Sequence, residues 1–304
     1  MSQTSYPPVR RRRRRRRRNY RPLIALVILA AVALLIWAVS AGQPESPEPT
    51  EPPATQAPTQ APTQAPTEPT VPPTEPPPPT AEEEIAAFAS QHGFTLADYP
   101  EKLVELYKRN PEAREYVLNY PLEQGKTHEI DISDQIDDPG VPLFIQWDSR
   151  WGYKEYVGSV GGLAGCGPTC MAMAVFHFTR DPAMTPAYMM DFAASNRQYA
   201  NEKTITQWAF FRDGSVELGL KCKELTSEQM ASESKLAAVL NEGKVIVANV
   251  GPGVFTEKGH FLLVVGYEDG KFRINDPNSR EKSEKLWEFS EFSDQIKMMW
   301  ALSK

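Results

Sequence analysis

The chain has 304 residues and a formal net charge of −6, but its charges are unevenly distributed. Residues 1–21 hold ten arginines and no acidic residue. Subtracting these from the 33 basic residues leaves 23 against 39 acidic ones, a net charge of −16 for residues 22–304. Nine consecutive arginines are typical of nucleic-acid-binding segments. The next stretch indicates a membrane instead, so we expect no nucleic-acid partner.

Residues 22–41 form an apolar stretch without a charge. Twenty helical residues span about 30 Å, the thickness of the hydrocarbon core of a bilayer. Basic residues on one side favour a cytoplasmic N-terminus, and Trp37 lies near the far interface. We predict a cytoplasmic Arg-rich tail (1–21) and an uncleaved transmembrane anchor (22–41). A signal peptide cleaved after Ala41 is the alternative, although the apolar run is longer than usual for one. In both cases the remaining chain is exported.

Residues 42–81 are rich in proline and threonine and repeat Thr-Gln-Ala-Pro at 55–58, 59–62 and 63–66. This composition has almost nothing to bury and predicts a disordered spacer. Proline favours polyproline II at about 3.1 Å per residue, so residues 43–80 reach on the order of 120 Å. That length suits a spacer that carries a domain through a cell wall. A partner that binds proline-rich segments is a weaker alternative, because the repeats lack an anchor residue.

Residues 82–138 predict short amphipathic helices. Apolar residues recur at helical spacing, and Asn110-Pro111 is typical of a cap and first turn for a helix over 112–118. We expect a short helical stalk or a cap packed on the main domain. A prosegment that covers an active cleft is the alternative. The apolar residues concerned are Ile85, Phe88, Ala89, Leu103, Leu106 and Tyr107.

Residues 139–304 have the length of one domain. The pattern predicts a strand over 141–145, a helix from Cys166, a short helix over 235–240 and then several strands. These strands are expected over 245–250, 261–267, 272–274 and 296–301. A helix followed by hairpins predicts an α+β domain in which the helix packs on an antiparallel sheet.

Cys166 is predicted to begin a buried helix. Gly165 precedes it, Pro168 suits the first turn, and an apolar run follows. Unpaired N–H groups and the helix dipole stabilise an anion there, which lowers a thiol pKa and favours a nucleophile. The alternative is a small apolar cysteine packed under a Gly-rich turn.

The other two cysteines carry a weaker signal. Cys166 and Cys170 stand one helical turn apart, a poor geometry for a disulfide. Pairing of Cys170 with Cys222 stays open, although we favour two buried, inert thiols. At least one of three cysteines in an exported chain is unpaired.

His260 is selected as the general base by elimination. His92 and His128 lie outside the domain that holds Cys166, and His177 lies eleven residues along the same helix, roughly 16 Å away. His260 follows Gly259 at the head of an apolar strand. A thiol needs such an imidazole nearby, and the imidazole needs a third group to fix its tautomer.

The third group follows from the register of the hairpin around Asp269-Gly270. A two-residue turn pairs Asp276 with Leu263, on the face opposite His260. A three-residue turn, or a bulge, pairs Asp276 with Leu262 and places it on the His260 face, within reach of the imidazole. We predict one of these two and assign Asp276 as the partner, with Asn275 as the fallback.

Two donors are candidates for stabilising the oxyanion of a tetrahedral intermediate. One is the backbone N–H of Cys166 at the start of its helix. The other is the side chain of Gln146, which follows the expected strand over 141–145. Trp147 and Trp151 either wall a cleft or pack in the core.

In combination these motifs resemble the papain-like cysteine peptidases. The resemblance is closer to the bacterial group related to the bacteriocin-leader-processing (double-glycine) peptidase domains, and it covers residues 139–304. It implies a papain-like fold with Cys166 as nucleophile, His260 as base and then acid, Asp276 as orienting residue and Gln146 as oxyanion donor. In the leader-processing enzymes the glutamine lies a few residues before the cysteine, and here the gap is twenty. The motifs are Gln146, Gly165-Cys166-Gly167-Pro168-Thr169, Gly259-His260-Phe261 and Asn275-Asp276-Pro277-Asn278.

We therefore expect a membrane-anchored, extracytoplasmic cysteine peptidase that hydrolyses amide bonds through a thioester. The leader substrate is not expected, because the chain has one apolar span, an outward-facing domain and no nucleotide-binding motif. Alternatives are an amidase or endopeptidase acting on peptidoglycan stem peptides, and a non-catalytic surface binding module. The dispersed His, Cys and acidic residues predict no metal, and we expect no cofactor. Nothing in the sequence indicates an oligomeric state.

Overall fold

The computed structural model describes residues 78–304. The predicted tail, the membrane anchor and the spacer up to residue 77 lie outside these residues. Within 78–304, no helix has both the length and the apolar character that a membrane crossing requires.

Three helices precede the main domain, as the sequence predicts. They are α2 (Ala81–Gln91), α3 (Glu101–Arg109) and α4 (Arg114–Glu123); residues 81–123, which hold them and the turns between them, are named here the helical segment. Thr80 and Glu83 form a capping box at the start of α2, and Asn110 caps the single turn that leads into α4. The apolar face of the helical segment packs against three buried residues of the main domain, Ile145, Trp147 and Tyr153. The helical segment is therefore docked on the main domain.

The helix that begins at Cys166 is present as α6 (Cys166–Thr179), directly after the short α5 (Gly161–Ala164). Residues 167–176 of α6 are all buried, as expected for a helix that is apolar on every side. Arg180 ends the helix in the left-handed conformation. A second helix, α7 (Pro186–Ala194), packs beside α6 and was not predicted.

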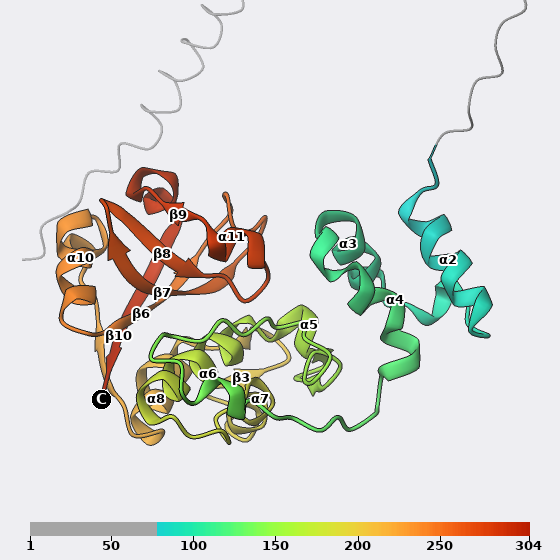
Figure 1. The fold of residues 1–304 in the computed structure, drawn as a ribbon, viewed down its shortest axis with the longest axis horizontal. Helices are drawn as coiled ribbons and strands as arrows, with labels where there is room; N and C mark the ends of the chain where they lie inside the picture. Colours follow the sequence, from blue (N-terminus) through green and yellow to red (C-terminus); the bar gives the residue numbers. More distant parts are fainter. Residues whose placement is uncertain (1–77) are drawn as a thin grey trace, which may run out of the picture. The chain divides into compact units, whose positions relative to one another are not determined.

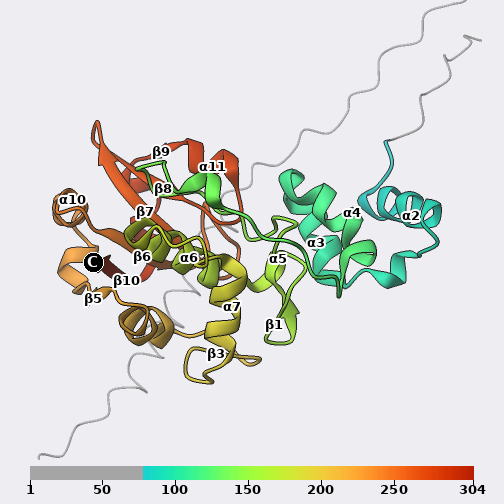
Figure 2. The same ribbon diagram turned by 60° about the horizontal axis from the view of Figure 1, so that its bottom comes forward.

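Six antiparallel strands form the main sheet, in the order β5-β10-β6-β7-β8-β9. Figure 1 shows this sheet in orange and red, with α6 on one side and α10 (Glu233–Asn241) on the other; Figure 2 shows the same arrangement from another angle. The predicted α+β architecture is confirmed. The strands are β5 (Lys221–Glu224), β6 (Val245–Val250), β7 (His260–Glu268), β8 (Lys271–Asn275), β9 (Leu286–Trp287) and β10 (Ile296–Ser303).

The remaining elements of the described residues, apart from five 3₁₀ turns, are short. They are β1 (Glu155–Tyr156), β2 (Ser159–Val160), β3 (Ala200–Asn201), β4 (Ile205–Thr206), a π-helical turn (Phe210–Gly214), α8 (Ser215–Glu217), α9 (Ser227–Met230) and α11 (Arg280–Glu284). Strands β1–β2 and β3–β4 form two small hairpins.

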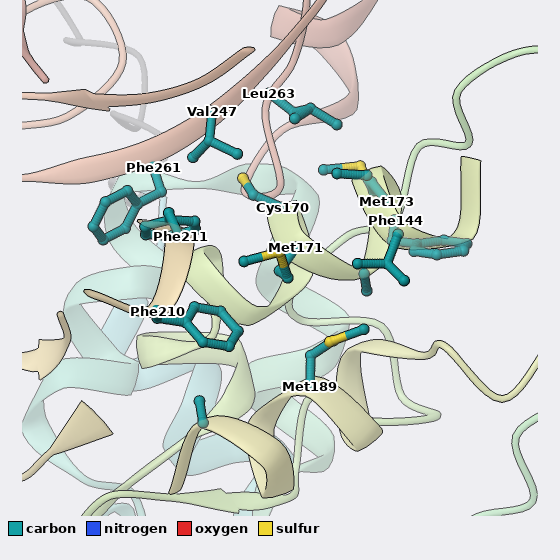
Figure 3. Packing of buried hydrophobic residues seen from close by; sticks show 14 of the residues in the cluster. Phe144, Cys170, Met171, Met173, Met189, Phe210, Phe211, Val247, Phe261 and Leu263 are labelled. Atoms are coloured by element: carbon teal, nitrogen blue, oxygen red, sulfur yellow. The ribbon is translucent and has the colours of Figure 1, made fainter. Parts of the chain in front are cut away.

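The sheet has an apolar core on each face. Figure 3 shows the core on the α6 side, where Cys170 and Met171 lie between Val247 and Leu263 of the sheet and Met189 of α7. Full burial of a large apolar side chain contributes about 1.5–3 kcal/mol. This packing fixes the axis of α6, and hence the position of its first residue, against the sheet.

The predicted strand over 141–145 is wrong. These residues have no regular secondary structure and pair with no strand of the described chain. Pro142 has no N–H to donate to a ladder, and its carbonyl accepts a hydrogen bond from the Asn275 side chain instead. The apolar residues Phe144 and Ile145 are buried in two different cores, which explains the apolar pattern without a strand.

Candidate active site

Cys166 lies at the first position of α6 and is partly buried. Its neighbour Gly167 is tightly enclosed, because a Cβ atom there would lie 2.7 Å from the Thr206 side chain. Thr206 is held in turn by a 2.8 Å hydrogen bond with the buried Tyr156 hydroxyl. Glycine after the cysteine therefore lets β4 approach the start of the helix closely.

His260 is the first residue of β7 and pairs with Val250 of the central strand β6. Its side chain is buried, and its Nε2 lies 2.7 Å from Oδ1 of Asp276. That contact uses Nε2 and leaves Nδ1 as the ring nitrogen for Cys166. The structure thus brings together the three residues that the sequence singled out.

The register of the β7–β8 hairpin explains this contact. The turn has two residues, Asp269 and Gly270, both with positive φ, so the predicted three-residue turn is wrong. A bulge at Val265 shifts the register by one, so that Leu263 pairs with Asn275. The predicted alternative, a bulge, is confirmed.

Asn275, the fallback partner for His260, has another role. Its side-chain amide donates a 3.0 Å hydrogen bond to the Pro142 carbonyl, and its Nδ2 lies 3.8 Å from the Met173 sulfur. Neighbouring residues on a strand face opposite sides of the sheet. Asn275 therefore ties the 141–145 segment to the sheet and does not orient the imidazole.

The electrostatics favour a thiolate–imidazolium pair. Burial raises the pKa of Cys166, but hydrogen bonding to His260, its charge, and the backbone N–H groups of Phe261 and Gly167 outweigh it and leave this pKa lowered. Burial lowers the pKa of His260. The charge of Asp276 and hydrogen bonds to Asp276 and Cys166 outweigh burial and raise this pKa to about 10. Both shifts favour proton transfer from the thiol to the imidazole.

Gln146 lies at the same site despite the gap of twenty residues. Its backbone N–H donates a 2.7 Å hydrogen bond to the Pro277 carbonyl, next to Asp276. One N–H of its side chain donates to the Gly162 carbonyl at 2.8 Å, just before the Cys166 helix. The amide nitrogen carries a second N–H, and Gln146 lines a hollow together with Cys166 and His260. The fold therefore brings Gln146 close to Cys166 although the two residues are twenty positions apart in the sequence.

The two tryptophans pack in the core, which was one of the two sequence interpretations. Trp151 donates a hydrogen bond to the Ile145 carbonyl and is buried. Trp147 is also buried, and its indole N–H donates to the Asn278 carbonyl at 3.2 Å. Both support the backbone around Gln146.

Two connected hollows meet at Cys166 and His260. The larger, about 930 Å³, extends toward Thr206 and Trp208, and the smaller, about 360 Å³, extends toward Gln146 and the loop after Asp276. Arg109 lines both, so the end of α3 forms part of the cleft wall.

Sequence reasoning missed the wall residues Arg109 and Trp208. Trp208 is 46% exposed in the cleft, and its ring packs edge-on against Trp300. Arg109 ends an amphipathic helix far from the motifs in sequence. A tryptophan outside the predicted helices and strands was the one available signal.

The other thiols are inert by comparison. All three cysteines lie within residues 78–304 and are free there. Burial raises the pKa of Cys170, and it raises that of Cys222 to about 11. His177 lies at the other end of α6, where its ring contacts the Gly140 carbonyl. Across the described residues, no group of three His, Cys, Asp or Glu side chains could hold a metal ion.

The arrangement fits covalent catalysis by a thiol. A lowered thiol pKa supplies the nucleophile, the adjacent imidazole can carry a proton, and a buried carboxylate fixes the ring. The Gln146 side chain lines a hollow that Cys166 and His260 also line.

A match to a family of peptidases agrees with this chemistry. Residues 139–304 match the family described as Peptidase_C39 like family. A search of curated proteins found no match. Two solved structures are similar at 17% identity. One is the peptidase domain of Streptococcus ComA, a bifunctional ABC transporter involved in quorum sensing (TM-score 0.37; 54% of this chain and 98% of that one). The other is a putative C39-like peptidase from Bacillus anthracis (TM-score 0.32; 58% and 97%).

Proposed function

The chain belongs to the Peptidase_C39 like family and is a cysteine-type peptidase, and we propose that Cys166, His260 and Asp276 form its catalytic triad. The substrate is a peptide or protein. The single observation that carries the assignment is the buried 2.7 Å contact between His260 and Asp276 next to a thiol of lowered pKa.

In the proposed reaction the Cys166 thiolate attacks the scissile carbonyl carbon, and the carbonyl oxygen becomes an oxyanion. The backbone N–H of Cys166 and the free amide N–H of Gln146 donate to that oxygen. Imidazolium His260 protonates the leaving amine as the C–N bond breaks, which leaves a thioester on Cys166. Water then gives a proton to His260 and attacks the thioester, releasing a carboxylic acid and the thiolate. Asp276 holds the ring orientation throughout.

We further propose that the enzyme works outside the cytoplasm, held at the membrane by residues 22–41. The support is in the sequence: a basic stretch, twenty uncharged apolar residues and a Pro-rich stretch follow one another. The spacer length of about 120 Å also favours a second substrate class, the stem peptides of a cell wall.

Thiol labelling tests the triad without a known substrate. The rate of iodoacetamide labelling at Cys166 is measured against pH for the wild type and for His260→Ala. We expect a labelling pKa below about 8.5 in the wild type and a higher one in the variant. Identical profiles would exclude an activated thiolate. Release of new amino termini from a peptide library, compared with release from purified wall, then separates the two substrate classes.

A further inference from the structure

The loop that follows Asp276 is held from outside the family-matched region. Residues 276–283 leave β8, turn and enter α11. The sheet side of this loop is fixed by Ser283, whose hydroxyl accepts a 2.8 Å hydrogen bond from the Asp276 N–H. The other side faces the helical segment, more than 160 residues earlier in the chain.

Glu112 makes the most extensive of these contacts. One carboxylate oxygen accepts a 2.5 Å hydrogen bond from the Ser279 hydroxyl and a 3.4 Å bond from the Glu281 N–H. The other accepts a 2.8 Å bond from the Arg280 N–H. One side chain thus binds three successive residues of the loop, and hydrogen bonds to an ionised acceptor are about twice as strong as neutral ones.

Asn110 binds the residue before these three. Its side-chain amide donates a 2.8 Å hydrogen bond to the Asn278 carbonyl, which also accepts from the Trp147 indole. Asn110 is buried and caps the turn that carries Glu112, through a 3.1 Å bond from the Glu112 N–H. The contacts of Asn110 and Glu112 with residues 278–281 are named here the clamp. Asn110 both belongs to the clamp and caps the turn that carries Glu112.

Asn278, which the clamp holds, is hydrogen-bonded directly to Asp276 of the proposed triad. The Asn278 N–H donates a 2.8 Å hydrogen bond to Oδ1 of Asp276, the same oxygen that contacts His260. A shift of Asn278 therefore moves or releases the oxygen that orients the imidazole. Nothing else in the helical segment bonds to this loop among the described residues.

We propose that Glu112 and Asn110 are positioning residues for Asp276, so that the helical segment completes the active site. The proposal rests on the triad proposed above. When the clamp is released, Asp276 stabilises the His260 cation less well, and the thiolate that pairs with this cation becomes less stable. The pKa of the Cys166 thiol then rises.

The test measures the midpoint of the iodoacetamide labelling profile of Cys166 in the full-length chain. Glu112→Gln removes the charge and replaces one acceptor oxygen by a donor. Asn110→Asp keeps the cap but removes the donor to Asn278. Glu115→Gln is the matched control, an exposed glutamate on the same segment that lines no part of the cleft.

We expect the midpoint to rise in Glu112→Gln and in Asn110→Asp and to stay at the wild-type value in Glu115→Gln. The labelling rate at pH 7 should fall by about threefold to tenfold, since a tenfold change is one pKa unit. Unfolding would also raise the midpoint, to about 8.5 as in a free thiol, so the melting temperature of each variant is measured beside it. A raised midpoint in a variant that melts like the wild type supports the positioning role.

Asp276→Asn separates the two proposals. A raised midpoint in Asp276→Asn with unchanged midpoints in both clamp variants overturns the positioning role and leaves the triad intact. An unchanged midpoint in Asp276→Asn overturns the triad itself. If one clamp variant does not fold, the other still tests the contact from its own side of the loop.

Discussion

His260 contacts Asp276 because β7 contains one extra residue, Val265, which forms a bulge in its pairing with β8. Glu268 pairs with Lys271 around a two-residue turn, and that register alone would turn Asp276 away from the imidazole. The bulge shifts the pairing by one between the turn and the site, so that Asp276 comes to the His260 face. The tight turn and the contact between His260 and Asp276 are thus compatible only through the bulge.

Replacing His260 is expected to abolish most of the activity. His260→Ala removes the proton carrier, and positioned general acid–base groups contribute about 10²- to 10⁴-fold. Hydrolysis of a peptide library, followed as new amino termini, should fall within that range. His177→Ala is the control, because His177 lies at the far end of α6. Equal activity in both variants would contradict the assignment of the base.

Activity should depend on pH in a bell shape that is broad toward alkaline pH. The rising limb reports deprotonation of Cys166, whose pKa is lowered, and the falling limb reports loss of the proton from His260, raised to about 10. The plateau between them holds the ion pair. The measurement is the initial rate of hydrolysis across pH 5–11. A falling limb near pH 6.5 would show that the pKa of His260 is not raised.

The same shift predicts a change in stability with pH. A raised His260 pKa stabilises the folded state fully below about 6.5, the unfolded value. This stabilisation is lost as the pH rises through about 10. The melting temperature of the wild type should therefore fall between pH 7 and 10.5, and that of His260→Ala should fall less. Parallel curves for the two proteins would refute the linkage.

Gln146→Ala should reduce hydrolysis but leave the thiol activated. Removing one oxyanion donor costs about 10²- to 10³-fold in kcat, whereas the contact between His260 and Asp276 does not involve Gln146. Peptide hydrolysis and iodoacetamide labelling are measured on the same preparation. A variant that also labels slowly would place Gln146 in the ion pair instead of the oxyanion site.

The turn residue Gly270 is expected to be sensitive to substitution. Its φ is +77°, and an L-residue there costs about 1–2 kcal/mol. Gly270→Ala should lower the free energy of unfolding by about that amount in urea titration. The control is Gly266→Ala in the adjacent strand, whose Cβ would lie at an ordinary 3.7 Å from Arg273. Equal stability of the two variants would mean that the turn relaxes.

Local patterns predicted the α6 helix, the four long strands and the order of the site residues. These depend on signals carried by neighbours: a glycine before the helix, an apolar run after Cys166 and turn residues at Asp269-Gly270. The bulge was reachable because one face of β7 had to carry both His260 and the contact to its partner. Its exact place, Val265, depends on packing.

Contacts between distant residues were beyond reach. The apolar pattern at 141–145 indicates a strand, yet Phe144 and Ile145 divide between two cores. Nothing near Glu112 in the sequence shows that its carboxylate binds the backbone near Arg280, because that pairing is decided by how the helical segment docks. Trp208 and Arg109 line the cleft, and their place there also depends on how distant parts of the chain pack together.

The docked helical segment also determines how the protein should respond to a cut in its backbone. Residues 124–144 join the helical segment to the main domain by a connection with one short 3₁₀ turn and no strand. Ile145 and Trp147 are buried on the far side of this connection, against the helices. A nick here leaves two pieces held by an apolar interface and by the Glu112 contacts, so they should elute together and keep their activity until the interface is denatured.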